Sequence, residues 1–389
     1  MTERDVLHDV IRIAYNAQHG IKESKQPFDA NALLKMAEKQ NVYPLVHYGI
    51  GELCFEQKAY KLTNRQLGAT YFVRKIAYLD VIAELESLGI RTILLKGYSC
   101  SRKYKEEYLR VSSDCDLFIL EEDEGAAQQI LEKKGFRCTE VRQEHQHHSV
   151  WIHDDVGICE LHTKFVEDDI DYVWESTFKE KELIEKRIRV DTEEGYFFRL
   201  PPVEEWVFLF VHTLKHFLQT GLSIQMLLDL YVSYNGLEDI HAQKALRLIT
   251  TSDFGALWKV FYEYIQKYGA GENVTEHSEA LEMITQDLLH SGWMGLKENT
   301  RRASLYDASN KRELPLRIWL HKVKTVLRRI IPERKIMERR YPVLIGKPWL
   351  FPYIYIARFG AKMLQRVWPS EKIKWMQKCA KLQKQNVCS

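Results

Sequence analysis

Residues 91–120 constrain the fold of this chain more than any other segment. They begin with an apolar run that predicts a buried strand and that ends at Lys96 and Gly97. A polar, basic stretch of helical character follows, and a second apolar run then carries Asp114 and Asp116. Because side chains alternate between the two faces of a strand, these two carboxylates lie on the same face. Two like charges so close together repel each other unless a cation or a proton lies between them, so the pair indicates a metal site.

A later strand supplies a third carboxylate. Residues 157–162 are apolar apart from Glu160 and His162, and the alternation of side chains puts these two on one face. An acidic side chain on an apolar strand is costly to bury unless it is paired or bound to a metal. Carboxylate oxygens combined with substrate phosphates are the ligands that Mg²⁺ prefers. We therefore predict a site for Mg²⁺, with Mn²⁺ as an alternative, made of Asp114, Asp116 and Glu160.

Residues around the aspartate pair predict phosphate binding. Lys96 and Arg110 can neutralise phosphate oxygens. Gly97 precedes a predicted helix, where backbone N–H groups can approach a phosphate. Ser113 lies directly before Asp114. These groups together are the parts that nucleotidyl or phosphoryl transfer needs, and the alternative is a strand end with solvent-exposed aspartates.

Histidines form two further groups. Five of them lie between residues 145 and 162, but their spacing fits no zinc template. His212 and His216 are one turn apart on a predicted apolar helix, residues 203–218, which lacks the Glu of the HExxH signature. This second pair either lines a substrate pocket or a domain interface, or is satisfied in the core.

The order of the predicted elements indicates an α+β fold. Residues 2–90 and 201–300 have helical patterns, and strands mixed with helices lie between them. The predicted strands are residues 91–95, 115–120, 136–141, 148–153, 157–162, 186–190 and 196–200. We divide the chain into an N-terminal helical cap (1–62), an α/β core (63–200), a helical domain that completes the pocket (201–300) and a basic, aromatic-rich helical region (301–389).

Charge is distributed unevenly, although the net charge is only +2. Residues 301–389 carry 22 Lys and Arg against 5 Asp and Glu, a net charge of +17, so the rest of the chain carries −15. Aromatic side chains interleave with the basic ones, a pattern typical of RNA-stacking surfaces, of helices at a membrane surface, or of a bundle with a basic exterior. The region therefore predicts contact with an anionic surface: nucleic acid, lipid or the acidic body of the chain itself.

Cysteine usage and hydropathy bear on location. The seven cysteines are scattered and form no CxxC pair, which indicates a reducing compartment rather than a disulfide framework or a zinc site. The first residues lack the shape of a signal peptide, and no run approaches the ~20 apolar residues that cross a bilayer. We predict a cytoplasmic protein without a transmembrane segment, with peripheral attachment to the membrane as an alternative.

These motifs resemble those of the bacterial family of nucleotidyltransferases that belongs to the DNA polymerase β-like superfamily. The matching residues are LLKG at 94–97, Arg110, DCDLFI at 114–119 and the E-x-H strand with Glu160 and His162. The resemblance implies a polymerase β-like core, a mixed sheet with helices, flanked by N-terminal helices and a C-terminal helical region.

The resemblance extends to side chains around the substrate. The family has a tyrosine in the helix after LKG, matched by Tyr104 or Tyr108. It also has a downstream His-x-x-x-His pair and a later Asp, matched by His212, His216 and Asp229. The resemblance implies that these side chains, together with the histidine of the E-x-H strand, line a substrate pocket.

The activity implied is Mg²⁺-dependent transfer of a nucleoside monophosphate from an NTP, such as ATP, to an acceptor hydroxyl or phosphate, with release of pyrophosphate. The acceptor can be a sugar, another small molecule, a protein or RNA. Two positions depart from the pattern: Lys96-Gly97 stands where the superfamily usually has Gly-Ser, and Gln225 stands where an Arg is expected.

Two alternatives stay open. The departures favour a non-catalytic binding or regulatory protein that keeps this fold. The string Arg110-x-x-Ser113-Asp114-x-Asp116 resembles the nucleotidyltransferase toxins of abortive-infection systems, whose acceptor is RNA. That second resemblance covers this string alone.

Overall fold

The computed structural model of the chain describes residues 2–25, 29–112, 114–140, 148–166, 177–219, 221–250, 255–270 and 279–290. The chain divides into two units, Met1–Ser309 and Asn310–Ser389, and every described residue belongs to the first. The predicted basic region at 301–389 and the predicted phosphate ligand Ser113 therefore lie outside the described residues. The four-part division of the chain stays a prediction.

A five-stranded mixed sheet carries the aspartate pair. Its strands are β1 (Ile93–Leu94), β2 (Asp114–Phe118), β3 (Arg137–Glu140), β4 (His148–His153) and β5 (Gly157–His162). Their order is β1-β2-β5-β4-β3, with β2 and β5 parallel and the other neighbours antiparallel. The α+β fold with a mixed sheet is confirmed. The turn sequence Asp-Asp-Val-Gly at 154–157 predicts a hairpin of the strands that flank it, and β4 and β5 form that hairpin.

Two helices cover one face of this sheet and leave the other for the carboxylates. α4 (Gln57–Ser87) and α6 (Glu124–Lys133) share a core with alternate residues of β2 and β5. Those strand residues are Cys115, Leu117, Cys159 and Leu161. Because side chains alternate along a strand, the residues between them point away from α4 and α6. The apolar half of each strand therefore fixes which face the polar half occupies.

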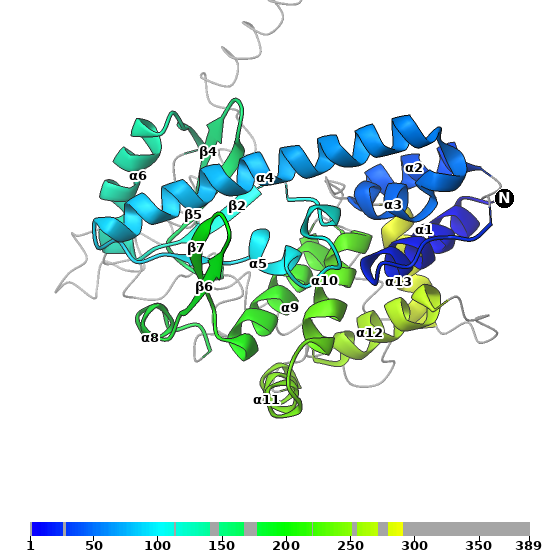
Figure 1. Cartoon of the computed structure of the whole chain (residues 1–389). Helices are drawn as coiled ribbons and strands as arrows, with labels where there is room; N and C mark the ends of the chain where they lie inside the picture. Colours follow the sequence, from blue (N-terminus) through cyan, green and yellow to red (C-terminus); the bar gives the residue numbers. More distant parts are fainter. Residues whose placement is uncertain are drawn as a thin grey trace, which may run out of the picture. The chain divides into compact units, whose positions relative to one another are not determined.

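The long helix α4 joins the sheet to the N-terminal helices (Figure 1). α1 (Glu3–Gln18), α2 (Ala30–Lys39) and α3 (Tyr43–Cys54) pack against one another, and α3 contacts α4. The sequence predicts this helix over residues 64–88, but it begins at Gln57 and runs for 31 residues. The helix thus crosses from the predicted cap into the predicted core.

The remaining elements complete the described part. Short pieces connect the strands: α5 (Tyr98–Ser101), η1 (Glu107–Leu109), η2 (Glu121–Asp123) and α8 (Glu180–Glu185). β6 (Ile188–Thr192) and β7 (Gly195–Arg199) form a separate two-stranded antiparallel sheet. The predicted helical domain contains α9 (Pro202–Gln219), α10 (Ile224–Asn235), α11 (Asp239–Thr250), α12 (Gly255–Gly269) and α13 (Glu279–His290). α9 begins at a proline, whose fixed φ suits the first helical position.

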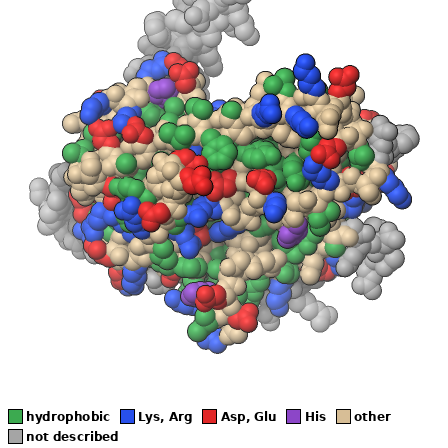
Figure 2. Space-filling view, viewed as in Figure 1, with side chains coloured by type: hydrophobic (Ala, Val, Ile, Leu, Met, Phe, Trp, Pro, Cys, Tyr) green, Lys and Arg blue, Asp and Glu red, His purple; other side chains and the backbone are tan. Residues whose placement is uncertain are grey.

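The described surface mixes charges of both signs. Figure 2 shows basic and acidic side chains interspersed on one face, with hydrophobic side chains at the surface over the middle of α4. The exposed apolar residues there include Phe72, Val73 and Ile76. No helix of the described part is both long enough and apolar enough to cross a bilayer.

One histidine of the N-terminal helices is buried among aromatic rings. His47 is 2% exposed, and the rings of Tyr43, Phe55 and Tyr60 stack within 5.6 Å of it, measured between centroids. Its Nδ1 lies 3.2 Å from Oδ1 of Asn64. Burial lowers the pKa of His47, and the contact with Asn64 opposes this only in part. The imidazole is therefore neutral in the folded protein at neutral pH.

This predicts a pH-dependent contribution to stability. The unfolded chain protonates His47 below a pKa of about 6.5, whereas the folded chain resists protonation, so stability falls as the pH falls through this value. We expect His47→Phe to lose less stability than wild type between pH 7.5 and 5.5, by up to about 1.4 kcal/mol per pH unit. Urea unfolding at both pH values measures this. The half-buried His241 offers a control, His241→Gln, and an equal loss in wild type and His47→Phe would contradict the prediction.

Candidate active site

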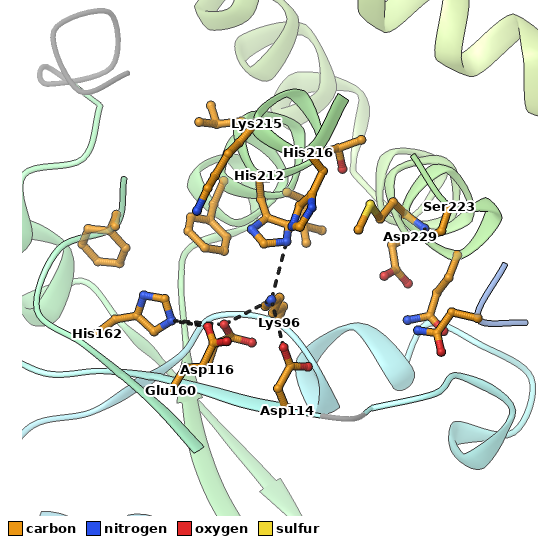
Figure 3. A pocket seen from close by; sticks show the side chains of 18 of the residues that line it. Lys96, Asp114, Asp116, Glu160, His162, His212, Lys215, His216, Ser223 and Asp229 are labelled. Carbon is orange, nitrogen blue, oxygen red and sulfur yellow. Dashed lines mark hydrogen bonds and ion pairs between the residues drawn. The ribbon is translucent and has the colours of Figure 1, made fainter. Parts of the chain in front are cut away.

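β2 and β5 present three carboxylates on the open face of the sheet (Figure 3). Asp116 stands directly opposite Glu160 in the parallel strand pair, and Asp114 lies two residues earlier on β2. One oxygen from each side chain lies within 4.8 Å of the others. Asp116 is 1% exposed, while Asp114 and Glu160 are half-buried. The structure thus brings the three predicted carboxylates together.

The ammonium of Lys96 lies among these carboxylates. Its Nζ is 3.1 Å from Oδ1 of Asp116, 3.4 Å from Oδ2 of Asp114 and 3.5 Å from Nε2 of His212 on α9. The backbone N–H of Leu95 donates to the carbonyl of Asp116, so the chain leaves β1 directly beside β2. Burial acts to lower the pKa of Lys96, but the carboxylate charges outweigh burial and raise it. Lys96 is therefore a fixed positive charge.

His162 joins two of the carboxylates. Its Nε2 is 3.1 Å from Oδ1 of Asp116 and 3.4 Å from Oε2 of Glu160. Burial acts to lower the pKa of His162, but these two contacts raise it above its usual value. Burial likewise acts to raise the pKa of Glu160, yet His162 and Lys96 hold it well below its usual range. His162 therefore orients the two carboxylates and helps to keep Glu160 ionised.

The donor set fits a divalent metal ion. Oδ2 of Asp116 is buried and has no hydrogen-bond partner among the described residues. An unsatisfied buried polar atom costs about 1–3 kcal/mol, which a bound cation would offset. Three carboxylate oxygens are the hard donors that Mg²⁺ takes, together with phosphate oxygens. His148, Glu160 and His162 form a second group whose donor atoms also lie within 4.8 Å of one another.

Helix α9 forms the wall opposite the carboxylates. His212 and His216 lie one turn apart on α9 and point toward Lys96, with Lys215 beside them (Figure 3). Burial lowers the pKa of His212, and the nearby ammonium groups lower it further. The same causes lower the pKa of His216 to about 4. Both imidazoles are neutral at neutral pH, so this wall offers ring nitrogens without charge.

A buried carboxylate fixes α9 relative to the turn that carries Lys96. Glu205 of α9 is 2% exposed and accepts hydrogen bonds from Nζ of Lys103 at 2.9 Å and from Nη1 of Arg199 at 3.1 Å. It also accepts from the hydroxyl of Ser99 on α5. Burial acts to raise the pKa of Glu205, but these cations keep it below its usual value. The network connects α5, β7 and α9.

The turn itself requires glycine. Gly97 has a φ of +69°, and a Cβ there would meet Oγ of Ser112 at 2.9 Å and the carbonyl of Asp114 at 3.4 Å. Any residue other than glycine would therefore have a strained backbone, and its Cβ would crowd the residues at the start of β2. The helix that follows, Tyr98–Ser101, is four residues long. The predicted phosphate contact of the Gly97 backbone stays a prediction.

Arg110 makes a buried pair with Asp229. Its Nε and Nη2 donate to the two carboxylate oxygens at 2.9 and 2.8 Å, and both residues are 6% exposed. The hydroxyl of Tyr104 donates to the same carboxylate at 2.7 Å. Gln225 on α10 adds a hydrogen bond to the carbonyl of Val111 at 3.0 Å. The pair therefore ties the segment before β2 to α10, and the role of Arg110 as a phosphate ligand stays a prediction.

One cavity of about 300 Å³ collects most of the predicted residues. Those that line it are Lys96, Arg110, Asp114, Asp116, Glu160, His162, His212, His216 and Asp229. Tyr104 is not among the lining residues, but its hydroxyl donates a hydrogen bond to Asp229, which is.

The lining residues that sequence reasoning missed include Asn41, Phe165, Phe208 and Lys215. The signal for Lys215 was available, because a lysine beside His216 interrupts an apolar helix. Nothing marked Asn41, which lies in a loop of the predicted cap. The two phenylalanines have the sequence pattern of ordinary core residues.

The model of a family described as an uncharacterised nucleotidyltransferase matches residues 26–256, more than half of the chain. The chain belongs to this family. The match contains the sheet, the three carboxylates, α9 and α10, so the predicted family relationship is confirmed. Membership identifies the chain as a transferase. Nucleotidyltransferases use NTPs, so the substrate class is an NTP. No curated protein matches the chain at a significant level.

The Arg110–Asp229 pair generates a prediction about stability. Asp229→Asn leaves the Arg110 guanidinium buried without a counter-charge, which typically costs about 3–5 kcal/mol. We expect urea unfolding to show a loss of this size. The exposed turn residue Asp155 provides a matched control, since Asp155→Asn should change stability by less than about 0.5 kcal/mol. Equal stability of the two variants would show that the pair is not needed to neutralise Arg110.

Proposed function

We propose that this nucleotidyltransferase moves a nucleoside monophosphate from an NTP to an acceptor hydroxyl, with Mg²⁺ held by Asp114, Asp116 and Glu160. One observation carries the proposal: three carboxylates from two paired strands converge in a cavity, and a buried oxygen of Asp116 lacks a partner among the described residues. Mg²⁺ bound there would neutralise phosphate charge and lower the pKa of the acceptor hydroxyl.

The chain's own residues have separate tasks in this proposal. Lys96 binds phosphate oxygens through its ammonium group, which carries three donors. His162 keeps Asp116 and Glu160 oriented. Because the pKa of Glu160 is held low, this carboxylate suits cation binding better than proton removal. The acceptor oxygen bonds to the α-phosphorus and its proton passes to water, as the bond to the pyrophosphate breaks.

The size of the cavity favours an acceptor that inserts only a small reacting group. Its volume of about 300 Å³ is at the lower end for ligand pockets. It joins the charged groups of the sheet to neutral imidazoles on α9 and to the rings of Phe165 and Phe208. A sugar, another small molecule, a protein side chain or an RNA end can each present one hydroxyl to such a site. Contact of residues 301–389 with an anionic acceptor or surface stays a prediction.

Removing a carboxylate charge tests the proposal. We expect Asp114→Asn and Asp116→Asn each to lower Mg²⁺-dependent nucleotidyl transfer by about 100-fold or more, since even supporting residues of a metal site cost 10–100-fold. The measurement follows label from the α-phosphate of each NTP into metabolite, RNA and protein acceptors, together with pyrophosphate release. Asp155→Asn removes an exposed carboxylate and should leave the rate unchanged.

Two results would contradict the proposal. Equal turnover in wild type and both aspartate variants would place the chemistry elsewhere. If the wild type binds a nucleotide but releases no pyrophosphate with any of the NTPs and acceptors in the panel, the chain has a binding role only.

A further inference from the structure

Lys96 already provides the positive charge that the carboxylate cluster needs. Its Nζ contacts Asp116 at 3.1 Å and Asp114 at 3.4 Å, the same side chains that are offered to a metal ion. A divalent ion bound to these oxygens would lie within a few ångströms of the ammonium. At such separations the repulsion between cations in a partly buried site is large. Lys96 and the ion therefore compete for the same negative charge.

Among the described residues, the cavity offers Lys96 one carboxylate beyond the cluster. This is Asp229, and that carboxylate is bound by Arg110 and Tyr104. The nearest group on α9 is the neutral imidazole of His212, at 3.5 Å. An ammonium displaced from the cluster would therefore be buried among described residues without a counter-charge, which is costly. A phosphate oxygen would remove this cost.

We propose that Lys96 is the built-in counter-ion of the site, and that it makes the site select a metal–triphosphate complex over the free metal ion. The triphosphate brings the anion that Lys96 needs when it leaves Asp116 and Asp114. The long, flexible lysine stem allows that shift, whereas a rigid side chain would not. This inference rests on the proposed function, because it names the form in which metal and nucleotide enter the same site.

Binding of Mn²⁺ tests the inference without any turnover. In wild type we expect the Mn²⁺ complex of inorganic triphosphate to bind at least about 10-fold more tightly than Mn²⁺ alone, measured by electron paramagnetic resonance and calorimetry. In Lys96→Met we expect Mn²⁺ alone to bind at least about 10-fold more tightly than in wild type, while the triphosphate complex binds more weakly. The preference is thus reduced or reversed.

Lys75 provides a matched control. Its side chain is also buried and its ammonium contacts two carboxylates, Glu107 at 2.8 Å and Glu194 at 3.0 Å, but it does not line the cavity. Lys75→Met should leave both Mn²⁺ affinities unchanged. Lys96→Gln, whose amide can still donate to Asp116, serves as a second neutral variant in case Lys96→Met does not fold.

The possible outcomes distinguish the inference about Lys96 from the proposed function. Mn²⁺ affinity in the Lys96 variants equal to or lower than in wild type overturns the inference. The inference is also overturned if the wild type binds free Mn²⁺ as tightly as it binds the Mn²⁺–triphosphate complex. This comparison needs no variant. If the preference is found but no nucleotide is ever transferred, the proposed function fails and the role of Lys96 stands.

Discussion

Three carboxylates on one face of a sheet repel one another, and the site depends on the positive groups that lie among them. Lys96 contacts two of the aspartate oxygens, and His162 joins Asp116 to Glu160. The pKa shifts follow this balance, because burial opposes charge on each group while the neighbours of opposite sign restore it. Glu160 is therefore ionised beside Lys96 and His162, as a ligand of a cation must be.

Helix packing and buried ion pairs hold these charged groups in position. On the far face of the sheet, α4 and α6 bury the alternate residues of β2 and β5, which fixes the direction of the carboxylates. Two buried ion pairs then position the helical wall. Glu205 connects α9 to the turn after β1, and Asp229 connects α10 to the segment before β2. These contacts hold a cavity between sheet and helices at the point where the charges meet.

The strands and the carboxylates could be predicted from sequence, because apolar runs and alternation are local properties of the chain. Each of the seven predicted strands overlaps one of β1–β7. The surroundings of the charges could not be predicted in this way. Arg110 meets a partner 119 residues away, and Lys96 meets His212 across 116 residues. Sequence reasoning assigned both cations to phosphate, since the contacts that hold them arise only when α9 and α10 pack over the sheet.

The most direct test of the central claim is the position of a metal ion in a crystal grown with Mn²⁺ and a non-hydrolysable NTP. We expect one anomalous peak at about 2.1 Å, the usual distance for such hard cations, from oxygens of Asp114, Asp116 and Glu160. The ammonium of Lys96 should then contact a phosphate oxygen. A peak at His148 and His162 instead, or nucleotide bound without a metal at the three carboxylates, would contradict the claim.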